Sequence, residues 1–504
     1  MKTFFKKPEY RSLKAGLLLL FGFAFFLRTY KWLNYSLWYD EVIWIMSGES
    51  FCRDFLVYSA KPPLFTILVF FWQNISGQEY FLRLPSLFFG VLNVFQIYLL
   101  GEVLFDKKVG LGAALLLAFS PLHIYYSQEL SPYTLVLSLV LAGNFFLLKW
   151  FQTNKSSYQY GYIFLTVAAI YTHYICFFLI LIHNIFIFLL YDKPAARLLK
   201  KWLISQLLVI VCVIPLGSLL WDSIQIMRSS PGTVYNWMPQ GDIFYFFCTF
   251  LTFIFGYHTQ LISRIVFVLL QIFLLFLLVK LFLKHRLRIV FLVCWLVLPP
   301  LLSLILGNFF AIPLYTHRNF FLSLPAYLIL LAFFLNQVAF KYRLTIVVIV
   351  FVLIGNSLVN YYKNEFYTPE RPYRPGIFSK KDHLKAALYI SDKFLVEDTV
   401  MHLSESNNSV FYYYFKKFSN DKLKVFMEKC SENEKYLLRE KEQLNERLKG
   451  YTRLWLVFSA WDYPYEPIPA LPSYIKSTLN KKFKVLESKK FEGIMLYLYD
   501  LQEK

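Results

Sequence analysis

The chain has 504 residues, of which 57% are hydrophobic, 20% aromatic and only 17% charged, and its formal net charge is +20. Soluble globular domains carry about 25% charged residues, so this composition excludes an ordinary cytosolic, secreted, fibrous or disordered protein. Residues 1–362 hold 27 Lys and Arg with 12 Asp and Glu, whereas residues 363–504 hold 25 with 20. We therefore expect a membrane domain over 1–362, a linker over 363–379 and a soluble domain over 380–504.

The first apolar run, residues 15–27, follows a basic N-terminus and leads into Arg28, and no small-residue cleavage site comes after it. This pattern predicts an uncleaved first span with the N-terminus in the cytoplasm. Lys and Arg favour the cytoplasmic side of a membrane, so basic loops indicate which apolar segments cross it. Placing all the basic loops inside together with the N-terminus puts 19 of the 27 Lys and Arg of 1–362 in the cytoplasm. These loops are 107–108, 149–155, 193–201, 280–288 and 341–343.

The loop charges predict eleven spans of roughly 20 residues each. An odd number of spans places the soluble domain on the outer side of the membrane, which is the plasma or inner membrane in this interpretation. Two further apolar segments, 62–76 and 242–258, then lie flat at the outer interface or re-enter. The predicted spans are 15–33, 82–104, 110–127, 133–151, 160–174, 175–191, 202–220, 262–283, 289–308, 318–336 and 344–362.

The C-terminal part is typical of a small α/β domain. Strand-like runs occupy 399–403, 423–427, 454–458 and 493–497, and helical spacing occurs at 380–395, 431–448 and 473–480. It contains no Gly-rich phosphate loop, which argues against a nucleotide site there. The sequence thus predicts a polytopic α-helical membrane protein with juxtamembrane helices and a small outer α/β domain. No signature of nucleic-acid binding is present.

The first outer loop carries two adjacent acids, Asp40 and Glu41, among aromatic residues. Trp38, Tyr39 and Trp44 would hold this loop at the level of the lipid headgroups. A carboxylate that is partly shielded from water is a better general base than one in bulk solvent. The alternative is that these acids belong to a solvated loop.

Three cations are expected at the same outer level. Lys61 precedes the first interfacial segment, Arg83 opens the second predicted span, and Arg318 opens the tenth. Together they could neutralise a phosphate, Arg with a planar fork and Lys as a point charge. Snorkelling of Lys61 is the simpler alternative.

The outer corner at 121–133 is dense in hydrogen-bonding side chains, which suits a sugar, although a capping turn with interfacial aromatic residues has the same composition. His317 lies next to Arg318 in the late outer segment. The candidate sugar- or acceptor-binding residues are Tyr39, Tyr126, Gln128, Glu129, Tyr133 and His317.

Four motifs in this order are similar to those of the type C glycosyltransferases of family 39. They are Trp-Tyr-Asp-Glu at 38–41, Lys-Pro-Pro-Leu at 61–64, Leu-Arg-Leu-Pro-Ser-Leu at 82–87 and Tyr-Tyr-Ser-Gln-Glu at 125–129. The family includes the protein O-mannosyltransferases and the bacterial transferase that adds aminoarabinose to lipid A. The resemblance implies a polyprenyl- or dolichyl-phosphate sugar as donor, and inverting transfer to a hydroxyl on the outer side.

The resemblance also implies roles for individual residues. Asp40 resembles the catalytic acid that acts as general base, and Glu41 its partner, which positions the acceptor or a metal. Lys61 matches a donor-phosphate lysine of the lipid A transferase, where the O-mannosyltransferases have His-Pro-Pro-Leu. Arg83 and Arg318 match basic residues at the start of spans.

The sequence requires no cofactor, and it contains no compact metal motif, although a divalent metal could serve the leaving phosphate. The expected partners are the lipid-linked donor, a lipid, glycan or protein acceptor, and the membrane. A flippase or transporter of lipid-linked sugars is the alternative function, but it would need ionisable residues near mid-span, where His183 is the main candidate. A third hypothesis is a non-catalytic scaffold that presents the C-terminal domain.

Overall fold

The chain forms two compact units in the computed structural model. We call Met1–Trp32 with Ser47–Ile377 the helical unit, and Leu33–Met46 with Phe378–Lys504 the sheet unit. Each unit is described by itself. The structure describes residues 14–49, 61–190, 196–229, 241–256, 261–312, 314–365, 380–404, 408–418, 425–429, 444, 446, 448–459 and 470–502.

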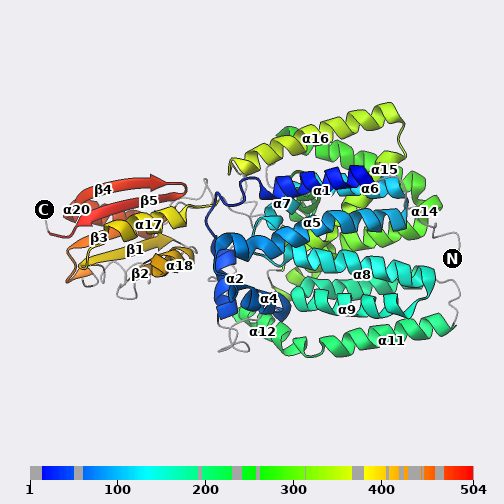
Figure 1. Ribbon diagram of the computed structural model, residues 1–504, viewed down its shortest axis with the longest axis horizontal. Coiled ribbons are helices and arrows are strands. Elements are labelled where there is room, and N and C mark those ends of the chain that lie inside the picture. Colours follow the sequence, from blue (N-terminus) through cyan, green and yellow to red (C-terminus); the bar gives the residue numbers. More distant parts are fainter. Residues whose placement is uncertain are drawn as a thin grey trace. The chain divides into compact units, whose positions relative to one another are not determined.

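The helical unit consists of apolar helices that run side by side (Figure 1). Helix α2 (Tyr39–Glu49) begins in the sheet unit and ends in the helical unit. The remaining elements are α1 (Lys14–Thr29), α4 (Pro63–Gln73), α5 (Glu79–Leu104), α6 (Lys107–Phe119), α7 (Pro121–Ser127), α8 (Tyr133–Thr153), α9 (Ser156–Thr172), η1 (Tyr174–Cys176), α10 (Phe177–Leu190), α11 (Ala196–Val213), α12 (Leu216–Ser229), α13 (Ile243–Phe255), α14 (Leu261–Phe310), η2 (His317–Ser323), α15 (Leu324–Asn336) and α16 (Phe340–Tyr362).

Each of the eleven predicted spans coincides with a helix, or with a pair of helices, in the described residues. Within these residues, five helices are long and apolar enough to cross a membrane, and seven if each bent pair counts as one span. The 50-residue α14 contains two predicted spans, with non-helical backbone at His285 between them. The number of spans stays a prediction, whereas the helical, apolar architecture is confirmed.

Two of the predicted spans are bent rather than continuous. Helices α6 and α7 meet at 63°, and α11 and α12 meet at 59°. Each bend precedes a proline, Pro121 or Pro215, whose missing N–H and bulky ring interrupt helical hydrogen bonding. The first bend also uses Ser120, whose hydroxyl accepts the N–H of His123 and so caps α7.

The two predicted interfacial segments form short helices. Helix α4 has 11 residues and α13 has 13, so both fall below the roughly 20 residues that a span requires. Helix α13 is exposed at its start and buried over Cys248–Phe255 at its end. Helix α4 packs against α5 and α9.

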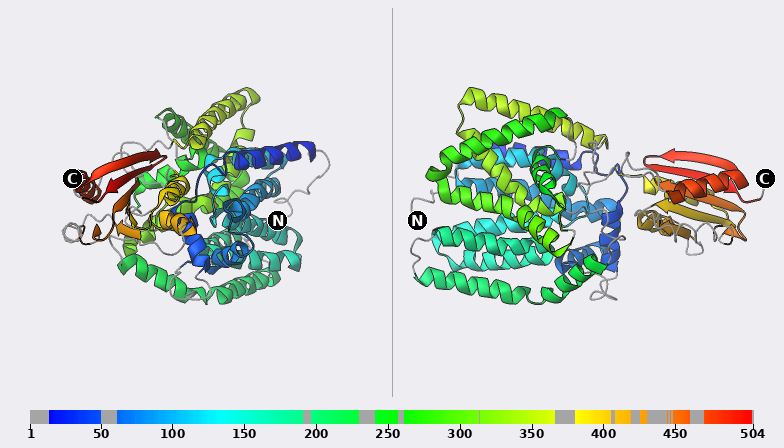
Figure 2. Two further views of the ribbon diagram at one scale, coloured as in Figure 1. Left: turned by 60° about the vertical axis from the view of Figure 1, so that its left-hand side comes forward. Right: turned by 180° about the vertical axis from the view of Figure 1, so that it is seen from behind.

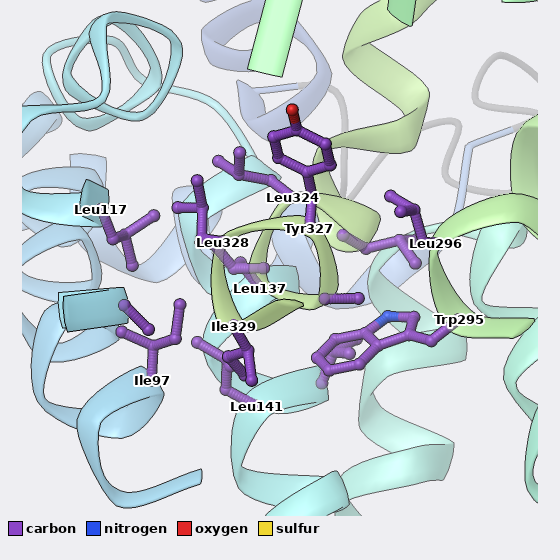
Figure 3. Close-up of a cluster of buried hydrophobic side chains, with 14 of the residues drawn as sticks. Ile97, Leu117, Leu137, Leu141, Trp295, Leu296, Leu324, Tyr327, Leu328 and Ile329 are labelled. Carbon is purple, nitrogen blue, oxygen red and sulfur yellow. The ribbon is translucent and has the colours of Figure 1, made fainter. Parts of the chain in front are cut away.

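Helices distant in sequence meet in a common interior (Figure 3). Trp295 of α14 is fully buried and lies in the same cluster as Leu137 and Leu141 of α8. Leu328 and Ile329 of α15 complete this part of the core. Because lipid tails are as apolar as these side chains, close packing rather than water exclusion holds such helices together.

The sheet unit contains a five-stranded sheet with helices (Figure 2). The strand order is β2-β1-β3-β5-β4; β1 pairs in parallel with β2 and β3, and β5 is antiparallel to β3 and β4. The predicted α/β class is therefore confirmed. Its elements are α17 (His383–Lys393), β1 (Asp398–Ser404), α18 (Asn408–Phe418), β2 (Val425–Lys429), β3 (Arg453–Ser459), α20 (Ala470–Lys482), β4 (Lys484–Phe491) and β5 (Ile494–Asp500).

Sequence patterns located four of the five strands and missed β4. This strand lies at the edge of the sheet and is mostly exposed on both faces, so it lacks the alternation of apolar and polar residues that reveals a half-buried strand. The prediction also missed α18, whose aromatic-rich sequence resembles a strand. Most of the predicted linker and of the helix at 431–448 lies outside the described residues.

Candidate active site

The two acids of the first loop lie in the first turn of α2. Glu41 is fully buried, and its carboxylate accepts the backbone N–H of Trp38 over 3.1 Å. A Glu three residues into a helix that bonds the residue before the helix forms half of a capping box. Asp40 is partly exposed at the same helix start, where the helix dipole favours negative charge. Glu41 therefore shapes the turn that presents Asp40.

Lys61 and Arg83 lie at the starts of two helices that contact each other. Lys61 directly precedes the prolines that begin α4, and its side chain is partly exposed. Arg83 lies in the second turn of α5, is fully buried, and donates from Nη1 to the carbonyl of Trp32 over 3.4 Å. The indole of Trp72 joins the two helices by donating to the carbonyl of Phe81 over 2.7 Å.

The predicted sugar corner and the late arginine segment come together in the helical unit. The rings of Tyr126 and Tyr133 lie 4.4 Å apart, and both contact Phe321 of η2, at 5.2 and 6.2 Å between centroids. Arg318 belongs to the same short helix as Phe321, and the ring of His173 lies 5.9 Å from that of Tyr133. The aromatic rings of this corner thus contact the short helix that carries Arg318.

Glu129 is a fully buried acid at this corner. Tyr125, four residues earlier, packs its ring edge-on against that of Tyr126. Buried carboxylates are rare unless they are hydrogen-bonded or paired. The corner therefore combines a buried carboxylate with aromatic rings.

Gln128 is engaged with the protein itself. Its amide nitrogen donates to the carbonyls of Arg28 and Tyr30 over 2.9 and 3.0 Å, and its amide oxygen accepts the hydroxyl of Tyr361 over 2.6 Å. These bonds tie the end of α1 to α7 and α16. Gln128 therefore has a structural role at this corner. Its direct contact with a sugar stays a prediction.

His317 is buried beside α13. Its Nδ1 lies 2.9 Å from the hydroxyl of Thr249, which in turn lies 2.6 Å from that of Tyr315. The ring of Tyr245 stacks on His317 at 6.1 Å. This polar chain fixes η2 against α13 and so fixes the start of the segment that carries Arg318.

Sequence reasoning missed a buried polar cluster centred on Arg28. The guanidinium donates to the carbonyls of Ala24, Leu117 and Ala118 over 2.9 to 3.1 Å, and lies 2.7 Å from Nδ1 of His123. Leu117 and Ala118 lie in the last turn of α6, where Pro121 has no N–H to donate and the carbonyl of Leu117 also accepts the N–H of Ser120 over 3.3 Å. The sequence did offer one indication of this cluster, because Arg28 is a charged residue inside the first predicted span.

His183 is the mid-span ionisable residue on which a transport hypothesis would rest. Its Nε2 lies 2.8 Å from the side-chain oxygen of Asn144, and its Nδ1 lies 3.1 Å from the hydroxyl of Tyr162. Both ring nitrogens therefore have partners within the core. In the described part of the chain, no group of three or more His, Cys, Asp or Glu side chains has a metal-binding arrangement.

The whole chain resembles a solved membrane enzyme. ArnT from Cupriavidus metallidurans in the apo state matches over 97% of this chain and 98% of its own, with 12% identity and a TM-score of 0.60. The same protein bound to undecaprenyl phosphate matches with a TM-score of 0.58. The fold is that of a type C glycosyltransferase.

Two further comparisons agree with this fold. Residues 60–221 match the family model described as dolichyl-phosphate-mannose-protein mannosyltransferase. The archaeal oligosaccharyltransferase AglB from Archaeoglobus fulgidus, in complex with an inhibitory peptide and a dolichol-phosphate, matches over 88% of this chain and 69% of its own, with 11% identity and a TM-score of 0.53. No curated protein sequence matches the chain. The resemblance found in the sequence motifs is confirmed.

Proposed function

We propose that this protein is an integral membrane glycosyltransferase that moves a sugar from a polyprenyl-phosphate donor to a hydroxyl acceptor on the outer face of the membrane, with inversion. The observation that carries the proposal is the meeting of the Tyr126–Tyr133 corner with the η2 segment of Arg318. It brings aromatic rings against the short helix that carries a cation. A structural neighbour of the same fold was solved with undecaprenyl phosphate.

Asp40 serves as the general base in this proposal. Its carboxylate takes the proton of the acceptor hydroxyl while that oxygen attacks the anomeric carbon from the face opposite the phosphate. The bond from the anomeric carbon to the phosphate oxygen breaks, and its electron pair leaves with the lipid phosphate. Glu41 holds the turn through its bond to Trp38, and Tyr39 lines the acceptor side.

Lys61, Arg83 and Arg318 stabilise the negative charge that develops on the leaving phosphate. Fixed cations in a site of low dielectric typically contribute several kcal/mol to such a step. Arg83 is buried, and the contact between Thr249 and His317 fixes η2. Both observations support this role, because cations that are already fixed need little rearrangement when the phosphate leaves. A lipid, glycan or protein hydroxyl is the acceptor, and a divalent metal is not required by this scheme.

The proposed topology has eleven spans, a cytoplasmic N-terminus and an outer C-terminal domain in the plasma or inner membrane. The distribution of basic loops supports it. In a cysteine-free background, an impermeant maleimide should label Gln78→Cys in intact cells and Lys108→Cys only after permeabilisation. The reverse labelling pattern would show that the protein has the opposite orientation in the membrane.

The function is tested by offering the purified protein a panel of polyprenyl-phosphate sugars with lipid, glycan and protein acceptors. Asp40→Asn should lower transfer by about a hundredfold or more. Glu49→Gln removes an exposed acid at the other end of the same helix and should stay within about twofold of the wild type. Wild-type transfer by Asp40→Asn would refute the base assignment.

A flippase has less support from the described residues. The mid-span His183 is bonded on both sides, and Arg28 holds the carbonyls of a helix end. Both are explained by structure without a transport path. A non-catalytic scaffold would not explain why the short helix that carries Arg318 packs against the aromatic corner.

A further inference from the structure

The segment that carries Asp40 is built into the sheet unit. Leu33–Met46 clusters with Phe378–Lys504 although more than 300 residues separate them along the chain. Two hydrogen bonds join the parts: Ser36 donates from Oγ to the carbonyl of Lys381 over 2.6 Å, and the N–H of Leu37 donates to the hydroxyl of Tyr414 over 2.7 Å. Ser36, Leu37 and Tyr414 are buried.

The first anchor, the carbonyl of Lys381, is itself held by the sheet. The next residue, Asp382, donates its N–H to the carbonyl of Glu492 over 3.0 Å, at the turn between β4 and β5. Asp382 also caps α17 through its side chain. Gly493 follows in that turn with φ +69°, and a Cβ there would lie 2.7 Å from Cγ of Lys381.

The second anchor, Tyr414, lies in α18, which packs against β1, β2 and α17. Phe411 and Phe415 of the same helix are buried and stack on each other. These contacts fix the direction of α18 and therefore the position of the Tyr414 hydroxyl.

The anchors act directly before the catalytic turn. The N–H of Leu37 is satisfied by Tyr414, and the next N–H, of Trp38, is satisfied by Glu41. Two successive backbone donors are thus fixed, that of Leu37 by Tyr414 of the sheet unit and that of Trp38 by Glu41 of α2. Asp40 follows within the first turn.

We infer that Tyr414 is a positioning residue, because its hydroxyl helps to orient the turn that carries Asp40. The inference rests on the proposed function. A general base must lie within hydrogen-bond reach of the proton it takes, and a displacement of about 1 Å can lower the rate by about a hundredfold. The Tyr414 hydroxyl sets that position without touching the substrate.

Hydrogen exchange on the full-length protein tests the contact independently of activity. Tyr414→Phe removes only the hydroxyl, and should speed exchange in peptides covering 33–46 while peptides from β1 and β3 keep wild-type rates. Tyr412→Phe, on the exposed face of the same helix, is the matched control and should change neither. Unchanged exchange at 33–46 in Tyr414→Phe overturns the inference.

Kinetics test the catalytic consequence. Tyr414→Phe should lower kcat by about tenfold or more while KM for the polyprenyl-phosphate donor stays within about twofold. Ser36→Ala removes the first anchor with a smaller change and should shift both readouts in the same direction. Faster exchange with a wild-type kcat would overturn the positioning role and leave the proposed function intact. Absence of transfer by the wild type would instead refute the proposed function. The hydrogen-exchange result would still show whether Tyr414 fixes residues 33–46.

Discussion

Arg28 shows how a single buried charge can hold a bend in a membrane helix. The guanidinium donates to the carbonyls of Leu117 and Ala118 in the last turn of α6. It also contacts His123 of α7, so one side chain holds both sides of the bend. A planar fork with five N–H groups can do this, whereas an ammonium group cannot.

Arg28→Met should destabilise the protein, because it keeps an unbranched apolar side chain but removes the guanidinium's hydrogen bonds to buried carbonyls. We expect the Tm of the detergent-solubilised protein to fall by about 5 °C or more. Arg28→Lys should recover only part of this loss. Lys108→Met, at an exposed position of α6, is the control and should leave the Tm unchanged. A wild-type Tm in Arg28→Met would contradict the role given to the guanidinium.

His383 gives the sheet unit a predictable response to acid. Burial, together with the charges of His402 and Lys381, holds the pKa of His383 well below its usual value. The unfolded chain regains an ordinary pKa near 6.5. As the pH falls below this value the unfolded chain binds a proton that the folded chain does not, so stability is complete above about pH 6.5 and declines below it.

His383→Gln should remove this part of the acid sensitivity. We expect hydrogen exchange in β1, corrected for the intrinsic effect of pH, to accelerate between pH 7.5 and 5.5 in the wild type and to change less in the variant. The difference should approach 1.4 kcal/mol per pH unit at most, the value for one proton. Equal pH responses in the two proteins would show that His383 is not the responsible group.

At the scale of elements, glycines set how closely α5 and α6 approach. A Cβ on Gly110 would lie 2.5 Å from the carbonyl oxygen of Tyr98, and one on Gly101 would lie 2.8 Å from the Cα of Gly110. Small residues at such crossings let membrane helices pack closely. These two helices carry Arg83 and lead into the bend at α7.

Gly110→Ala should therefore push α5 and α6 apart and destabilise the protein by about 1–3 kcal/mol. Gly22→Ala provides the contrast, because no atom lies within 4 Å of its would-be Cβ in α1. It should be neutral or slightly stabilising. Thermal unfolding of both variants measures the difference, and equal Tm values would contradict the close crossing.

Most helices were predictable from the sequence because apolar runs and basic loops report directly on the bilayer. The bends were less predictable: Pro121 indicates an interruption, but its angle depends on Arg28, which comes from another helix. Strand β4 was missed since an exposed edge leaves no alternating pattern.

The motifs located the candidate acids and cations, yet not what holds them. The bond between Leu37 and Tyr414 joins residues 377 positions apart, and no local pattern records it. Similarly, the residues next to Gln128 in the sequence predict that it binds a sugar, whereas its amide forms hydrogen bonds with the ends of α1 and α16. Tertiary contacts of this kind are not encoded by residue type or spacing.

At the scale of the whole molecule, the two units divide the proposed chemistry. Asp40 belongs to the sheet unit, whereas Lys61, Arg83 and Arg318 belong to the helical unit. Substitutions at Asp40 and at these cations therefore test the proposed role of each unit by itself. Such a division would let donor binding and acceptor activation vary separately in mutants.

The anomeric configuration of the product tests the central claim most directly. Purified protein is supplied with a polyprenyl-phosphate sugar of known configuration and a hydroxyl acceptor, and the product is analysed by NMR. We predict a glycoside of the opposite configuration, formed by the wild type and lost in Asp40→Asn. A glycoside with the donor's configuration, or undiminished product from Asp40→Asn, would contradict direct displacement assisted by this carboxylate.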